Sequence, residues 1–190
     1  YRFANLLRQR QEGLREELDI PNTIKRTIER GGFLKVAFRK TTVPSEYLFL
    51  VDEQQHQSLQ KQLFKYLIAF LEDKDIHLQV FYYEKQLHRL WNDEFPEGTD
   101  LYHIQRLYPH HRLIVLGGGH GLLKPYGGIR LTDDTIRGQL QQWRERLLLS
   151  PTPVASWGFK EQAIHEEMMA VFPADVEGFQ TAMVYLEMDE

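Results

Sequence analysis

The chain has 190 residues and a mass of 22.5 kDa, and 42% of its residues are hydrophobic. This size fits one ordinary domain with a small appendage, which argues against a disordered tail or a two-domain enzyme. Lys and Arg number 23, Asp and Glu number 27, and no stretch gathers the basic residues that tracking a phosphate backbone requires. Nucleic acid is therefore not an expected partner.

The absence of cysteine excludes disulfides, iron–sulfur clusters, thiolate zinc sites and a cysteine nucleophile. No apolar run reaches the roughly 18 residues of a membrane span, so we expect a cytoplasmic protein with no membrane partner. The chain begins at Tyr1, inside a charged segment, and we interpret it as a piece of a longer protein.

The first 43 residues carry three local patterns. Residues 2–18 have leucines near helical spacing and predict a weakly amphipathic helix. Asp19 before Pro21 marks the start of a short helix over 21–30, and Gly31-Gly32 marks its end. Within residues 33–43, Leu34, Val36 and Phe38 alternate with Lys35, Ala37 and Arg39, which predicts a half-exposed edge strand.

From Pro44 onward, apolar runs alternate with amphipathic stretches. Runs at 47–51, 76–83 and 113–116 predict strands, the first of them buried on both faces. Between the first two lies a predicted helix, whose buried stripe would be formed by Leu59, Leu63, Leu67, Phe70 and Leu71. A short helix is expected over 99–107.

The last third predicts one long helix, one strand and two further helices. Thr132 can cap a helix that extends through residue 148, with Ile136, Leu140, Trp143 and Leu147 on its buried face. A shorter strand is expected at 153–157, followed by helices over 159–170 and 174–188.

This alternation predicts an α/β fold, a three-layer Rossmann-like sandwich with a mostly parallel sheet, plus a short N-terminal helical segment. The expected division is residues 1–43 as N-terminal helices with an edge strand, and residues 44–190 as the α/β domain. Ligands of such sheets bind outside the carboxyl ends of the strands. The residues at that edge are Asp52 to His56, Glu84, Gly117 to Gly121 and Trp157.

Three residues at this edge carry candidate chemistry, and each also has a structural interpretation. Asp52 can hold a cation or cap the next helix, and His56 can act as a base or remain solvated. The loop from Gly117 to Gly121 can form an anion-binding nest, and His120 within it is the best candidate for a titrating group. The loop matches neither the phosphate-loop spacing nor the dinucleotide fingerprint, so nucleotide binding is the weaker alternative.

Four features of the chain together resemble the von Willebrand factor A family. They are the strand that ends in Asp52, the helix after it, the Gly-Thr-Asp-Leu segment at 98–101 and the strand that enters the glycine loop. That family's metal-ion-dependent adhesion site implies a ligand set of Asp-x-Ser-x-Ser, a Thr and a second Asp. By position, Asp52 matches the first Asp and Thr99 the Thr. Gln54 and His56 replace the serines, and Gly118 replaces the second Asp. Because Mg²⁺ prefers oxygen ligands, the resemblance implies an eroded metal site.

Four short segments are also similar to degenerate von Willebrand A-like modules of bacterial multidomain proteins: Arg-Gly-Gly-Phe at 30–33, the heptapeptide at 46–52, Tyr-Pro-His-His-Arg-Leu at 108–113 and His-Gly-Leu-Leu at 120–123. The role implied for such modules is protein interaction or assembly, without cofactor or catalytic residue. The binding residues would then be Asp52, Gln54, His56, Thr99, Gly118, Gly119 and His120.

Two functions are therefore expected. The first is a non-catalytic interaction module of a larger bacterial protein, whose partner is another protein or a neighbouring domain of the same polypeptide. The alternative is a metal- or nucleotide-dependent hydrolase that uses Asp52, His56 and His120. A third hypothesis, that residues 2–30 mediate oligomerisation, is compatible with the first.

Overall fold

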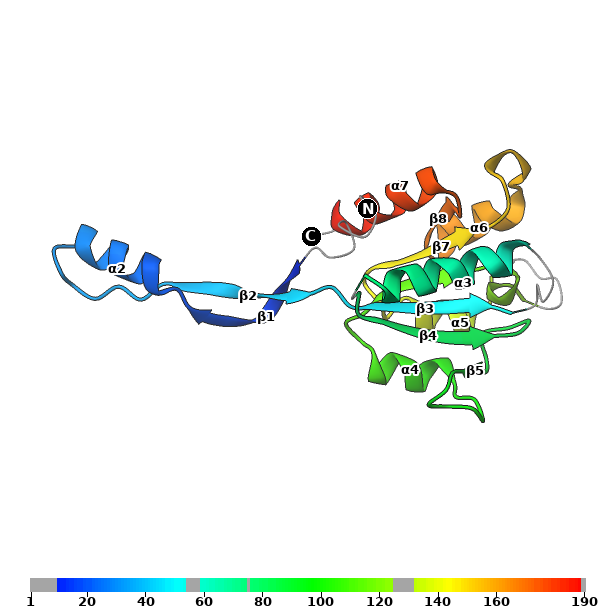
Figure 1. The fold of residues 1–190 in the computed structure, drawn as a ribbon, viewed down its shortest axis with the longest axis horizontal. Helices are drawn as coiled ribbons and strands as arrows, with labels where there is room; N and C mark the ends of the chain where they lie inside the picture. The colour runs from blue at the N-terminus through cyan, green and yellow to red at the C-terminus, as the bar shows by residue number, and fades with distance from the viewer. Residues whose placement is uncertain (1–9, 54–58, 75, 125–131, 189–190) are drawn as a thin grey trace. The chain divides into compact units, whose positions relative to one another are not determined.

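The computed structural model describes residues 10–53, 59–74, 76–124 and 132–188, and it divides the chain into two compact units (Figure 1). The smaller unit, residues 8–45, is called the hairpin unit below. The described part of the larger one begins at Glu46, and this unit is called the α/β unit. The division after Ser45 lies close to the boundary expected after Val43.

The hairpin unit is a two-stranded antiparallel ribbon with a helix between its strands. Strand β1 (Arg10–Leu18) pairs with β2 (Phe38–Pro44), and Leu18 lies opposite Phe38. The predicted helix over 2–18 is therefore wrong for its described part, residues 10–18. Pairing with a strand more than twenty residues away outweighs the weak helical pattern, as tertiary contacts commonly do.

Helix α2 (Ile20–Glu29) is confirmed, with the predicted signals at both ends. The Asp19 carboxylate accepts a hydrogen bond from the Asn22 backbone N–H at 3.0 Å, and Pro21 occupies the first turn, where no backbone donor is needed. Gly31 and Gly32 follow the helix with φ of 68° and 96°, a conformation that favours glycine.

The returning segment, residues 33–37, lies against α2 rather than in the predicted strand, which begins only at Phe38. The backbone N–H groups of Lys35 and Ala37 donate to the hydroxyls of Thr27 and Thr23 at 3.1 and 2.9 Å. These backbone donors are therefore satisfied by helix side chains instead of a neighbouring strand.

The α/β unit contains a six-stranded sheet in the order β5-β4-β3-β6-β7-β8, which confirms the predicted fold class. All neighbours are parallel except β5, which runs antiparallel to β4 at one edge. The strands are β3 (Tyr47–Asp52), β4 (Leu78–Tyr83), β5 (Leu90–Trp91), β6 (Arg112–Leu116), β7 (Arg146–Ser150) and β8 (Ala170–Pro173).

Helices cover both faces of this sheet and form the outer layers of the sandwich (Figure 1). Side chains of α4 (Leu101–Leu107), α5 (Asp134–Leu140) and α6 (Phe159–Glu167) join one apolar cluster. Side chains of α3 (Leu59–Glu72) and α7 (Val176–Met188) join the other. Strand β3 contributes Leu48 and Leu50 to the first cluster and Phe49 to the second, so it is buried on both faces as predicted.

The buried stripe of α3 matches the prediction only in its second half. Leu71 is buried and Leu67 and Phe70 pack against the same cluster, as predicted. Leu63, however, is 44% exposed, and the buried positions nearby are Phe64 and Ile68. Both sets have helical spacing, and a run so rich in apolar residues does not by itself select one.

The C-terminal third departs most from the prediction. The expected helix over 132–148 ends at Leu140, and Leu147 belongs to strand β7. The helix is capped by Asp133, whose carboxylate accepts from the Thr135 N–H at 2.9 Å, and not by Thr132. The segment expected as a strand at 153–157 contains the short 3-10 helix η2 (Val154–Ser156), and the missed strand β8 begins where α6 was expected to end. In the part of the chain that the structure describes, no helix is both long and apolar enough to cross a membrane.

Candidate functional site

The chain direction across the sheet reverses between β3 and β6, which are neighbours although two other strands lie between them in sequence. In doubly wound sheets this reversal opens a crevice at the carboxyl ends of the two strands, where ligands bind. Asp52 ends β3 at this point, and Gly117 directly follows β6. The sequence-predicted edge is thus the structurally expected one.

Asp52, Tyr83 and Gly117 pack tightly together at this point. A Cβ atom on Gly117 would lie 2.6 Å from the Asp52 Cβ and 3.3 Å from the Tyr83 hydroxyl oxygen. Only 7% of Asp52 is exposed, and Tyr83 is fully buried. Gly117 is needed because side chains at the ends of β3 and β4 occupy the space that a Cβ atom there would fill.

Tyr83 is a buried polar residue that the sequence analysis did not select. Among the residues that the structure describes, its hydroxyl has no hydrogen-bond partner. Burial raises the pKa of this phenol well above its ordinary value, and the charge of Asp52 raises it further. The only sequence signal for it was a polar aromatic residue at the end of the apolar run 76–83.

The glycine-rich loop is also explained by close packing. Gly119 has a φ of 75°, and a Cβ there would lie 2.6 Å from the Ile164 Cδ1 of α6. A Cβ on Gly121 would lie 2.7 Å from the Tyr83 ring and 3.1 Å from the Lys85 carbonyl oxygen. Gly118 and Gly119 are buried, whereas His120, at the start of the 3-10 helix η1 (His120–Leu122), is exposed. The loop therefore brings the backbone against neighbouring elements.

Thr99 lies far from Asp52 in the sheet. Thr99 pairs with Leu90 of β5. Leu90 pairs with Tyr83 of β4, and Tyr83 pairs with Asp52 of β3. Three strand spacings of about 4.8 Å place the two backbones about 14 Å apart, so they cannot share one metal ion. Gln54 and His56 lie outside the described residues. Among the residues that are described, no group of three His, Asp or Glu is arranged to hold a metal ion.

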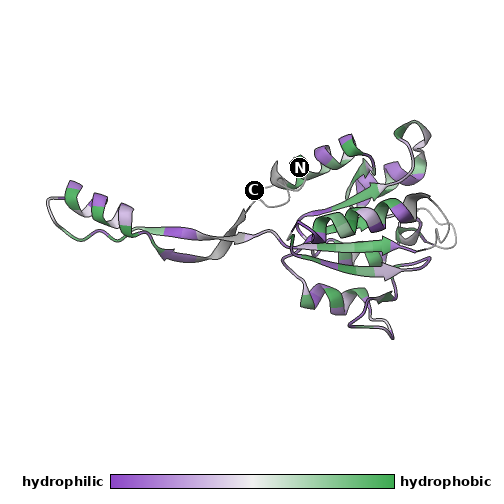
Figure 2. Ribbon diagram, viewed as in Figure 1, coloured by the Kyte–Doolittle hydropathy of each residue, from purple (hydrophilic) through white to green (hydrophobic). Residues whose placement is uncertain are grey.

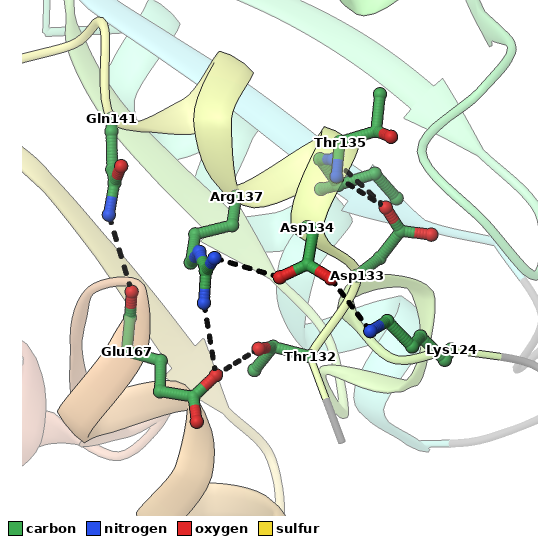
Figure 3. Close-up of polar contacts among 9 residues, drawn as sticks. Lys124, Thr132, Asp133, Asp134, Thr135, Arg137, Gln141 and Glu167 are labelled. Atoms are coloured by element: carbon green, nitrogen blue, oxygen red, sulfur yellow. Dashed lines mark hydrogen bonds and ion pairs between the residues drawn. The ribbon is translucent and has the colours of Figure 1, made fainter. Parts of the chain in front are cut away.

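A polar cluster connects α5 with the end of α6 (Figure 3). The Glu167 carboxylate accepts from the Thr132 hydroxyl, and it faces the Arg137 guanidinium at 3.5 Å. Arg137 also donates to Asp134 at 2.7 Å, and Lys124 donates to the other oxygen of that carboxylate at 2.7 Å. Each of these charges has an opposite partner within the cluster, which fits a role in holding the two helices together.

A shallow hollow lies beside strand β5. Its lining consists of His88, Arg89, Phe95, Gly98, Thr99, Asp100 and His103. The Phe95 ring contacts the His103 ring edge-on, with 5.8 Å between centroids, and the Arg89 guanidinium donates to the Glu97 carbonyl oxygen. Four exposed acidic residues belong to the same segment: Asp93, Glu94, Glu97 and Asp100.

The hairpin unit exposes large apolar side chains, which we call its apolar face. Ile28 is 71% exposed, and Phe33 and Leu34 are 79% and 76% exposed. Figure 2 shows hydrophobic stretches in α2 and in the segment that follows it. We define the face as Ile20, Ile24 and Ile28 of α2 together with Phe33, Leu34, Val36 and Phe38.

The alternation in the returning segment explains three of the seven residues of this face. The side chain of Ala37 is buried against α2 and that of Lys35 is partly buried, whereas Leu34, Val36 and Phe38 are exposed. Helix α2 itself has no buried residue. A two-stranded ribbon is marginally stable in water, and so small a unit ordinarily needs a staple or a partner. The described part of the hairpin unit therefore lacks a core of its own.

Comparison with protein-family models, with curated proteins and with solved structures found no significant match to this chain.

Proposed function

We propose that the chain is a non-catalytic interaction or assembly module of a larger bacterial protein, and that it binds a protein through the apolar face of the hairpin unit. The observation that carries this proposal is the exposure of seven large apolar side chains on a unit whose described part has no core. Burying one such side chain completely contributes about 1.5–3 kcal/mol. A partner that covers the face would therefore stabilise the hairpin unit and be bound by it.

The composition of the face suits a protein partner. Isoleucines four residues apart on one helix are the anchor pattern of helix-in-groove recognition. Lys25, Arg26 and Arg30 are exposed on the same helix or just after it, so basic side chains accompany the apolar ones. An apolar centre with a charged rim is the usual composition of a protein–protein interface.

For the α/β unit we propose a von Willebrand A-like fold whose metal site is eroded. The doubly wound strand order with one antiparallel edge strand supports this assignment. The wide separation of Thr99 from Asp52 and the glycine at position 118 support the loss of the metal site. In this proposal Asp52 stabilises the sheet edge and does not bind a cation.

The test places a photoreactive amino acid at Ile24 in the full-length protein and irradiates the cells that contain it. A matched control places the same group at Tyr66 of α3, which is 73% exposed and lies in the other unit. We expect a discrete covalent adduct from position 24, at least five times its yield from position 66. Adding Ile28→Ser and Phe33→Ser should remove the adduct, because both substitutions take apolar surface from the face. Equal yields at positions 24 and 66 would overturn the proposal.

A further inference from the structure

We infer that the apolar face of the hairpin unit is covered by the α/β unit of a second copy of this chain, in a reciprocal exchange between two copies. The inference rests on the proposed function, because it names the partner of the same face. Three observations support it: the charges of the two units, the exposed area of the face, and an acidic surface on the α/β unit.

The two units carry opposite net charge. Residues 8–45 contain nine Lys and Arg against five Asp and Glu, which leaves 14 Lys and Arg against 22 Asp and Glu for the rest of the chain. The bias is strongest around the apolar face, where residues 20–40 contain six basic residues and only Glu29 as an acid. Two hairpin units facing each other would therefore bring like charges together, whereas a hairpin unit facing an α/β unit would bring opposite charges together.

The area of the face fits a stable interface. From their exposed fractions, its seven side chains expose on the order of 900 Å², and one partner contributes about 800 Å² to an interface of standard size. In a reciprocal exchange the same contact forms twice around a two-fold axis. Such an arrangement closes on itself and does not extend into a fibre.

The acidic surface beside β5 offers the complementary composition. The exposed carboxylates of Asp93, Glu94 and Glu97 lie in the segment that carries Phe95, whose half-buried ring lines the hollow. Tyr102 of α4, nearby in sequence, is 58% exposed and adds apolar surface. The exposed charges of this segment are mainly carboxylates, with Arg89 as a cation among them, and Phe95 supplies apolar surface. This excess of acid complements the basic residues around the apolar face, so we assign this surface as the docking site.

The test is sedimentation velocity of the 190-residue chain and of two charge-reversed variants. The first variant, Lys25→Glu with Arg26→Glu, reverses the hairpin unit. The second, Asp93→Lys with Glu94→Lys, reverses the docking site. Each variant places like charges in both contacts of its own dimer, so we expect the dissociation constant of each homodimer to rise at least tenfold above the wild-type value.

An equimolar mixture of the two variants is the decisive sample. Each contact in the mixed dimer again pairs opposite charges, so the mixture should dimerise with an affinity within about threefold of the wild type. Lys65→Glu and Glu72→Lys, both at exposed positions of α3, are the matched controls and should leave the wild-type dimer unchanged. Far-ultraviolet circular dichroism of each variant checks that it is folded.

Two results would overturn the inference. One is a wild-type chain that remains monomeric at concentrations up to 100 micromolar, a limit on the order of a weak but specific affinity. The other is a wild-type dimer that either variant leaves intact, or that the mixture fails to restore. The adduct at Ile24 separates this failure from failure of the proposed function. An adduct with a different protein contradicts the second copy but supports an interaction module, whereas absence of any adduct contradicts both.

Discussion

Replacement of Gly119 by alanine tests whether the glycine-rich loop serves packing or ligand binding. The substitution adds one methyl group at a position with a φ of 75°, directly against Ile164 and Leu148. The added Cβ would lie 2.6 Å from the Ile164 Cδ1 and 3.2 Å from the Leu148 Cδ2. Both neighbours are fully buried, so they have little room to move.

Two terms determine the size of the effect. Holding a residue with a Cβ in the left-handed conformation costs about 1–2 kcal/mol. Forcing a methyl group into a packed core costs about 1–3 kcal/mol more. We therefore expect Gly119→Ala to lower the free energy of unfolding of the α/β unit by about 2–5 kcal/mol.

Urea denaturation followed by tryptophan fluorescence measures this loss. All three tryptophans, Trp91, Trp143 and Trp157, lie in the α/β unit, so the signal reports on that unit. Gly138→Ala in α5 is the matched control, because a Cβ there meets nothing within 4 Å. It should leave stability unchanged or raise it by up to about 1 kcal/mol. A loss below about 1 kcal/mol for Gly119→Ala would refute the packing interpretation, and ligand binding by the loop would then need testing.

Three further predictions concern buried polar groups of the α/β unit. Tyr83→Phe removes a hydroxyl that has no hydrogen-bond partner in the described part of the chain, and it should raise stability by about 1 kcal/mol at neutral pH. Because the folded state raises the pKa of this phenol, wild-type stability should fall as the pH rises above the ordinary value of 10.0, and the variant should lose less in an alkaline urea series. Glu145→Gln should lower the free energy of unfolding by about 3 kcal/mol in the same denaturation assay. The substitution removes the carboxylate that pairs with Arg112, a charged side chain that is only 3% exposed. A loss below about 1 kcal/mol would contradict this reasoning. Burial acts to raise the pKa of Glu161, but hydrogen bonds from the Gly158 N–H and the Lys160 side chain outweigh it and lower that pKa. Glu161→Gln should therefore lower the free energy of unfolding by about 1 kcal/mol near pH 7, and by progressively less as the pH falls below the ordinary carboxyl pKa of 4.5. An equal loss at pH 7 and at the acid end of the titration would show that the ionised carboxylate does not stabilise this helix start.

The sequence alone identified the elements whose signals are local. Strand β3 contains a continuous apolar run, residues 47–51, that is bounded by Pro44 and Asp52, and such a run is buried on both faces wherever a parallel sheet places it. Helix α2 carries its own start and stop signals in Asp19, Pro21 and the two glycines that follow it. The fold class followed from the alternation of these elements, and the carboxyl edge at Asp52 followed from the fold class.

Only the tertiary structure decided the elements whose partners are distant in sequence. Residues 10–18 form a strand because β2 pairs with them, and residues 146–150 form a strand because β6 and β8 lie on either side. The candidate site changed for the same reason: pairing of Thr99 with Leu90 separates it from Asp52, a distance that no spacing in the sequence encodes. The sequence also could not predict that the isoleucines at 20, 24 and 28 are exposed. An apolar stripe on a helix has the same sequence pattern whether its own chain or a partner covers it.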